Sequence, residues 1–212
     1  MKKFARLLAF FLSAAICACV CAACALEKST ELKYFSFTLN YTGDGYVVAA
    51  SSEEAPITII IPAEYEGLPV TEIAENGFSG TNCANIKELV VKAENVTVGA
   101  HAFRGLPNLR YAEFRDTVNL TVGSFAFEGC PELKEIKFSD KLSVLSVNQF
   151  AFKSAGFETV EITAGNVTLG DYAFAACKSL KSFRISAATH TVSETAVDMC
   201  DALDGIEYVP AN

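Results

Sequence analysis

Histidine and cysteine, the residue types that most often bind metals or act as nucleophiles, form no reactive cluster in this sequence. His101 and His190 each stand without a second histidine, cysteine or carboxylate at ligand spacing on the same stretch. A zinc site needs three or four such ligands. The sequence also contains no nucleophile elbow, zinc-protease helix, P-loop or dinucleotide-binding fingerprint. We therefore predict that the protein is not an enzyme and that it has no catalytic residue, metal site or cofactor.

The first residues of the chain have the organisation of an export signal. Residues 1–6 carry three cations and no acid, and residues 7–23 form an uninterrupted run of apolar and small residues. We predict a cleaved, lipoprotein-type signal peptide at 1–23 and a short linker at 24–33. A run of this length is at the short edge of what spans a bilayer, so an uncleaved membrane anchor is the alternative.

Three of the eight cysteines lie in this leader, and a fourth, Cys24, follows it directly and ends a recognisable motif. Cys21-Ala22-Ala23-Cys24 resembles a bacterial lipobox, although that pattern usually has leucine where this chain has Cys21. In this family of signals the final cysteine receives a diacylglyceryl group and becomes the mature N-terminus. The resemblance implies lipidation of Cys24 and attachment to a membrane through the lipid anchor. Cys19 is a second candidate site.

An apolar residue, nearly always phenylalanine, recurs every 22 to 25 residues through the rest of the chain. The column consists of Phe78, Phe103, Phe127, Phe152, Phe174 and Val197. A β-branched pair precedes most members of the column, and a short segment of alternating apolar residues follows them, which predicts two short extended pieces per repeat. Because one unit cannot bury its own apolar side chains, the units must stack into a solenoid with a continuous core.

Three further columns repeat with the same period. Their members are Asn95, Asn119 and Asn166, then Gly99, Gly123 and Gly170, and finally Cys130, Cys177 and Cys200. We interpret the asparagines, which are also in N-x-T sequons, as turn residues, and the glycines as positions after the second strand where a positive φ costs little. The cysteine column reads as a small buried apolar position, since leucine and alanine also fill it. Buried thiols are therefore favoured over a disulfide framework, although Cys177 and Cys200 are on adjacent coils and could pair.

The repeat written as V-T-x-I-G-x-x-A-F-x-x-C-x-x-L-x-x-I-x-I is similar to that of BspA-like bacterial leucine-rich repeat proteins. Residues 167–180 and 120–133 are close copies, and the match covers about 70–209. The resemblance implies an α/β, β-dominated, right-handed leucine-rich-repeat solenoid with a stacked parallel sheet and short turns or helices on the other side. We expect a β-rich N-terminal cap segment at 34–69 and about six coils at 70–212. It also implies a secreted or surface-attached, noncatalytic binding protein with a role in adhesion.

Charge suggests where a partner could bind. Removing the three leader cations from a chain of formal net charge −8 leaves −11, which does not suit a nucleic-acid partner. Against this acidic background, Lys87, Arg110, Lys134 and Lys181 occupy one column beside the predicted strands, with Tyr111 among them. This row is our candidate site for an anionic glycan or an acidic patch on an extracellular protein. The alternative is a solvated face in which neighbouring acids, including Glu113, cancel the field.

A second outward column alternates in charge from coil to coil, which predicts a self-compensating ladder with a structural role. Its members are Val90, Glu113, Lys137, Glu161, Arg184 and Glu207. Taken together, these patterns favour a noncatalytic protein- or glycan-binding protein that is exported and either lipid-anchored at the cell surface or secreted. The alternative function is a structural spacer of the cell envelope with no defined soluble ligand. The last strand edge is a second candidate interface.

Overall fold

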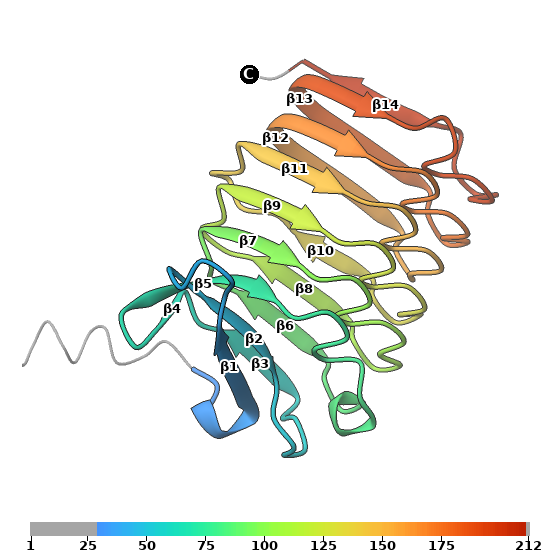
Figure 1. The fold of residues 1–212 in the computed structure, drawn as a ribbon. Coiled ribbons are helices and arrows are strands. Elements are labelled where there is room, and N and C mark those ends of the chain that lie inside the picture. Colours follow the sequence, from blue (N-terminus) through green and yellow to red (C-terminus); the bar gives the residue numbers. More distant parts are fainter. Residues whose placement is uncertain (1–28, 211–212) are drawn as a thin grey trace, which may run out of the picture.

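Each turn of the chain contributes two short strands that pair with the equivalent strands of the turns before and after it. The computed structural model describes residues 29–210, and these residues form a β-solenoid of about seven turns (Figure 1). The predicted solenoid with stacked parallel strands is therefore confirmed. The aromatic column accounts for six turns, and a further turn at the N-terminal end lies within the segment 34–69.

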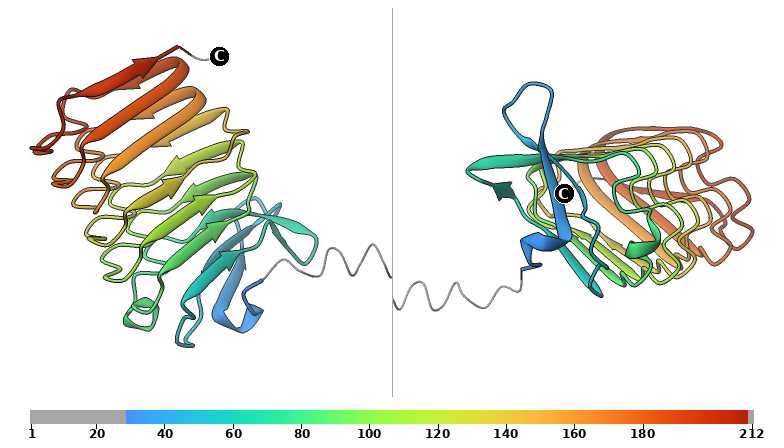
Figure 2. Two further views of the ribbon diagram at one scale, coloured as in Figure 1. Left: turned by 180° about the vertical axis from the view of Figure 1, so that it is seen from behind. Right: turned by 60° about the horizontal axis from the view of Figure 1, so that its bottom comes forward.

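The strands divide into two layers with a sharp corner between them. They are β1 (Phe35–Leu39), β2 (Tyr46–Ala50), β3 (Thr58–Ile61), β4 (Glu64–Tyr65), β5 (Leu68–Ile73), β6 (Glu88–Val91), β7 (Asn95–Val98), β8 (Tyr111–Phe114), β9 (Asn119–Val122), β10 (Glu135–Lys137), β11 (Val144–Val147), β12 (Thr159–Leu169), β13 (Ser182–Val192) and β14 (Ile206–Val209). The front layer, nearest the viewer in Figure 1, contains β2, β5, β7, β9, β11 and the C-terminal halves of β12 and β13. The back layer, seen from behind in Figure 2, contains β3, β6, β8, β10, the N-terminal halves of β12 and β13, and β14.

Nearly all strand pairs are parallel, because each strand pairs with its counterpart one turn away. The antiparallel pairs are at the N-terminal end, where β1 pairs with β2 and β4 forms a small hairpin with β5. The remaining side of the solenoid consists of turns (Figure 2). Helix in residues 29–210 is limited to two 3-10 segments, η1 (Leu32–Tyr34) and η2 (Thr81–Cys83), neither of which is long enough to cross a membrane.

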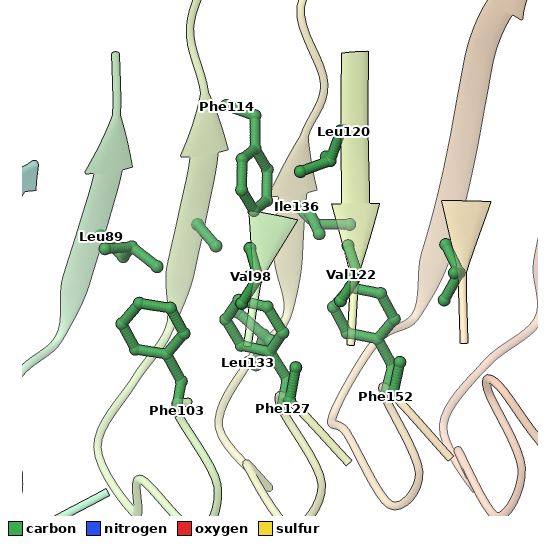
Figure 3. Close-up of a cluster of buried hydrophobic side chains, with 14 of the residues drawn as sticks. Leu89, Val98, Phe103, Phe114, Leu120, Val122, Phe127, Leu133, Ile136 and Phe152 are labelled. Atoms are coloured by element: carbon green, nitrogen blue, oxygen red, sulfur yellow. The ribbon is translucent and has the colours of Figure 1, made fainter. Parts of the chain in front are cut away.

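The aromatic column forms the centre of the core. Phe103, Phe127 and Phe152 are fully buried, and their rings stack with centroids 5.0 and 5.1 Å apart. Figure 3 shows these rings in a row beneath leucine, valine and isoleucine side chains from both layers. Burial of one such ring stabilises the fold by about 2–3 kcal/mol. The stack therefore fixes the register from turn to turn.

The glycine column has a different cause from the one that the sequence suggested. Gly99, Gly123 and Gly170 do not have positive φ. A Cβ on Gly123 would instead lie 2.6 Å from the carbonyl oxygen of Val98 in the preceding turn. The prediction of a left-handed backbone at these glycines was wrong, because the close approach of successive turns is what excludes a side chain there.

In most turns left-handed backbone occurs at two other positions, two residues before and two residues after the buried column residue. Gly105 and Gly129 occupy the position after it, where φ is about 70°. Non-glycine residues fill the same position in later turns, namely Ser154, Ala176 and Met199. The position before the aromatic is also left-handed and is held by His101, Phe125, Phe150 and Tyr172. These half-buried rings form a second stack, with centroids 4.9–5.0 Å apart.

The asparagine column also requires a correction. Asn95 and Asn119 are the first residues of β7 and β9 and lie on the strands rather than in turns. The Asn119 Nδ2 atom donates to Asn95 Oδ1 at 2.6 Å, and Thr189 donates to Asn166 in the same way. The side chains thus bond to one another between turns and do not satisfy turn backbone groups.

The four cysteines among the described residues are buried free thiols. Cys130, Cys177 and Cys200 donate to the carbonyl oxygens of Phe103, Phe152 and Phe174 at 3.2, 3.3 and 3.1 Å. The column is therefore a small buried position, as predicted, and its thiol also partners a carbonyl group of the turn before. The lipidation candidates Cys19 and Cys24 lie outside the described residues.

Candidate functional site

The outer face of the back layer holds the basic row. Alternation along each strand points one set of side chains into the core and the other outward. In β8, for example, Ala112 and Phe114 are buried in the core, so Tyr111 and Glu113 lie on the outer face. The basic residues stand one position before these strands, where the chain enters the back layer.

Three cations of the row lie on consecutive turns. The backbone N–H of Arg110 donates to the carbonyl of Lys87 at 2.8 Å, and that of Lys134 donates to the carbonyl of Arg110 at 3.1 Å. Their Cα atoms are therefore about one strand spacing apart, ~4.8 Å. Among residues 29–210, no carboxylate forms an ion pair with any of the three side chains.

The fourth predicted cation is separated from this group. Glu158 occupies the column in the next turn, and its carboxylate pairs with Lys181 at 3.1 Å. A shallow depression of about 400 Å³ beside Lys134 is lined by Glu135, Glu158 and Glu161. The structure thus brings Lys87, Arg110 and Lys134 together and places Lys181 beyond an acidic boundary.

Tyr111 lies in the neighbouring column rather than in the basic row. It is in register with Glu88 on β6 and Glu135 on β10. Burial raises the pKa of the Tyr111 hydroxyl to about 12, and the charge of Glu113 adds to this effect. Tyr111 is therefore a neutral, half-buried ring beside the cations, with acids on both sides of it.

The alternating charge column forms the predicted ladder. Glu113 pairs with Arg115 at 2.8 Å and with Lys137 in the next turn at 3.9 Å. Arg184 lies 4.0 Å from Glu161 and 3.0 Å from Glu207. The hydrogen bond from Arg115 lowers the pKa of the Glu113 carboxyl. These charges are thus compensated within the protein, in agreement with the structural role predicted for the column.

Neither histidine is placed for catalysis or metal binding. The ring of His101 stacks on Phe125 at 4.9 Å, and its buried Nδ1 atom has no hydrogen-bond partner among the described residues. His190 stacks on Tyr208 at 4.3 Å near the C-terminal end of the solenoid. Within residues 29–210, no group of three or more histidine, cysteine or acidic side chains could hold a metal ion.

Two surface features were not found from the sequence. A cavity of about 630 Å³ lies at the corner below the β4–β5 hairpin, and Thr71, Asn95 and Lys141 are among its lining residues. The outer face of the front layer carries ordered columns of asparagine and threonine. The recurring N-x-T triplets signal the second feature, whereas the cavity combines residues of several turns and leaves no local pattern.

Comparison with known proteins gives a family and a fold. Residues 71–204 match the model of the BspA type leucine rich repeat region, in six copies. No curated protein matches the chain.

Two solved structures resemble the whole solenoid. A leucine-rich repeat protein from T. pallidum is 24% identical, with a TM-score of 0.63 over 86% of this chain and 83% of that one. A leucine-rich repeat protein from Bacteroides ovatus is 22% identical, with a TM-score of 0.58 over 84% of this chain. The chain spans about half of the Bacteroides protein, 47% of its length. At 22% and 24% sequence identity, these similarities show the fold alone.

Proposed function

Because the chain belongs to the BspA-type leucine-rich repeat family, we propose that it is a noncatalytic binding protein of the cell exterior. Its binding surface is the basic row on the back face, and its partner is an anionic glycan. A solenoid offers an extended face of aligned side chains rather than an enclosed cleft, which suits binding more than catalysis.

One observation carries this proposal. Lys87, Arg110 and Lys134 stack on three consecutive turns without an intramolecular ion pair. Most other cations on the back face, such as Lys137 and Arg184, are paired with acids. Like charges repel one another when they are carried by side chains whose Cα atoms are only about 4.8 Å apart, so a polyanion that neutralises all three would be bound favourably. A polymer with regularly spaced acidic groups fits a row of regularly spaced cations better than an irregular protein patch.

The test is binding of soluble polyanions by purified residues 25–212, which contain every core side chain from Phe35 to Cys200. Heparin and polygalacturonate supply sulfate and carboxylate groups. We expect saturable binding in isothermal titration calorimetry that weakens as salt rises from about 0.05 to about 0.5 M, because screening acts on exposed charges.

The informative variant carries Lys87→Glu, Arg110→Glu and Lys134→Glu. The matched control carries Lys33→Glu, Lys141→Glu and Lys178→Glu, which change the net charge equally but lie elsewhere. Loss of binding in the first variant alone supports the proposal. Equal losses in both would show only an effect of net charge, and absence of wild-type binding would favour the spacer function or an acidic protein partner.

We further propose that the protein is exported and anchored through a lipid on Cys24. The basic residues 1–6, the apolar run 7–23 and the motif ending in Cys24 support this location. Metabolic labelling with a fatty acid should label the wild type and lose the label in Cys24→Ser. If the label persists in that variant but is lost in Cys19→Ser, the anchor is at Cys19. Label that remains in the double variant would exclude both.

A further inference from the structure

The outer face of the front layer differs in composition from every other strand face of the protein. Over five turns, from β7 to the C-terminal half of β13, none of its ten outward positions carries a formal charge. These positions are held by Asn95, Thr97, Asn119, Thr121, Val144, Ser146, Asn166, Thr168, Thr189 and Thr191. All are exposed or half-buried. On the back face, by contrast, the outward positions are rich in glutamate, lysine and arginine.

The ten side chains form a regular two-column lattice. In one column Thr97, Thr121, Ser146, Thr168 and Thr191 pair in register from turn to turn. The other column, which begins with Asn95, follows the same register. The spacing is ~4.8 Å between turns and ~6.6 Å along a strand, since outward positions are two residues apart. The lattice therefore repeats along the solenoid axis.

Two hydrogen bonds order four of the ten side chains, all of them in the column that begins with Asn95, on either side of Val144. Asn119 donates to Asn95 at 2.6 Å, and Thr189 donates to Asn166. Each amide has two donors and an acceptor with two lone pairs, and each hydroxyl can donate and accept, so unused capacity remains on both columns. Ordered side chains lose little further entropy on binding.

Strand formation alone does not account for this composition. Threonine favours strands, but asparagine is depleted in them, and yet it begins β7 and β9 and recurs at Asn166 in β12. An exposed sheet face also needs no neutrality, as the charged back face of the same protein demonstrates.

A groove adjoins the lattice at its N-terminal end, where Glu72 of β5 is in register with Thr97. The cavity of about 630 Å³ below the β4–β5 hairpin is lined by Thr71 of β5 and by Asn95, the first lattice residue. Its lining also includes charged residues, namely Glu64, Lys92, Glu94, Asp116 and Lys141, so the groove marks the end of the uncharged surface. A chain lying along the columns would enter this groove beside Asn95.

We propose that the front face binds an extended, neutral polysaccharide chain whose axis follows the two columns. Sugar hydroxyls donate and accept hydrogen bonds, as do the amides and hydroxyls of the lattice, and a polymer repeats as the turns repeat. A charged ligand would lose hydration without meeting an opposite charge at any of these ten positions. A protein partner is disfavoured because protein interfaces depend on aromatic and arginine anchors, which the ten positions lack.

This inference is independent of the basic row, which lies on the opposite layer. Salt separates the two. Binding to a neutral polysaccharide should change little with ionic strength, whereas binding to a polyanion should weaken.

The experiment is affinity electrophoresis of residues 25–212 in gels that contain xylan, mannan, amylose or a β-1,3-glucan. We expect retardation by at least one of these polymers. Thr121→Arg places a long cation at the centre of the lattice and should weaken binding by about tenfold or more. Thr121→Val keeps the shape, removes one hydroxyl and should weaken binding about fivefold, as expected for one neutral hydrogen bond.

The matched control is Thr159→Arg, an identical substitution at an exposed strand position of the back layer. It should leave retardation unchanged. Migration unaffected by all four polymers would overturn the proposal, as would equal retardation of Thr121→Arg and the wild type. Loss of retardation in both arginine variants would also contradict it, because the effect would then not be specific to the front face.

Discussion

Replacing Gly123 with alanine tests the reason for the glycine column. The new Cβ would lie 2.6 Å from Val98 O, 2.9 Å from Ala100 N and 2.9 Å from Gly99 C, all of them backbone atoms of the preceding turn. Favourable contacts between non-bonded heavy atoms need about 3.5 Å, so the two turns must separate by more than half an ångström. Their separation is fixed by the hydrogen bond from Gly123 N to Val98 O, at 2.8 Å.

The cost can be worked from these contacts. Overpacking of this kind costs about 1–3 kcal/mol, and weakening the backbone hydrogen bond adds about 1 kcal/mol. Alanine also reduces the conformational entropy of the unfolded chain, which stabilises the folded protein by about 0.4–1 kcal/mol and offsets part of this cost. We therefore expect Gly123→Ala to lower the free energy of unfolding by about 1–3.6 kcal/mol, measured by urea denaturation of residues 25–212.

Gly129→Ala is the matched control. Its φ is 71°, but the nearest atom to a new Cβ is Gly105 Cα at 3.9 Å. A left-handed alanine costs about 1–2 kcal/mol, partly offset by the unfolded-state effect, and Ala176 already occupies the equivalent position. The reasoning is refuted if Gly123→Ala is as stable as Gly129→Ala or more stable.

Three further predictions follow from the core, the charge ladder and the thiols. Phe127→Ala should lower the free energy of unfolding by about 3–5 kcal/mol and Phe125→Ala, at a half-buried ring, by about half of that or less; equal losses in urea denaturation would contradict the distinction between inner and outer stacks. The pKa of Glu113 is lowered in the folded protein, so its ionised carboxylate stabilises the fold above the ordinary pKa of 4.5, and this stabilisation is lost as the pH falls through the lowered pKa. The free energy of unfolding of the wild type should therefore exceed that of Glu113→Gln by a margin that shrinks between about pH 6 and about pH 3. A margin that stays constant over this range would exclude the linkage. Burial raises the pKa of Cys130 to about 12, whereas the neighbouring Cys177 thiol lowers the pKa of Cys200. Iodoacetamide should therefore modify Cys200 before Cys130 in the native protein, and mass spectrometry that found Cys130 equally reactive would argue against these environments.

The sequence by itself determined the repeat, the buried aromatic column and the small cysteine position. Phe103 and Phe127 must be buried wherever the turns stack, because no single turn can cover its own apolar side chains. The ion pair between Glu113 and Lys137 could also be predicted from the sequence, because equivalent residues of adjacent parallel strands lie side by side. These features depend on periodicity alone.

Only the tertiary structure decided what depends on contacts between turns. Gly123 is a glycine because of its distance from Val98, and Lys181 is neutralised because Glu158 lies in the turn beside it. Both facts depend on the distance and the register between two neighbouring turns. The residue types alone do not specify that distance or that register. The uncharged side chains around Thr121 likewise form one continuous surface because the strands of successive turns are aligned in register on one face. Local sequence sets which side chains are inside, whereas the fold sets which outward side chains meet.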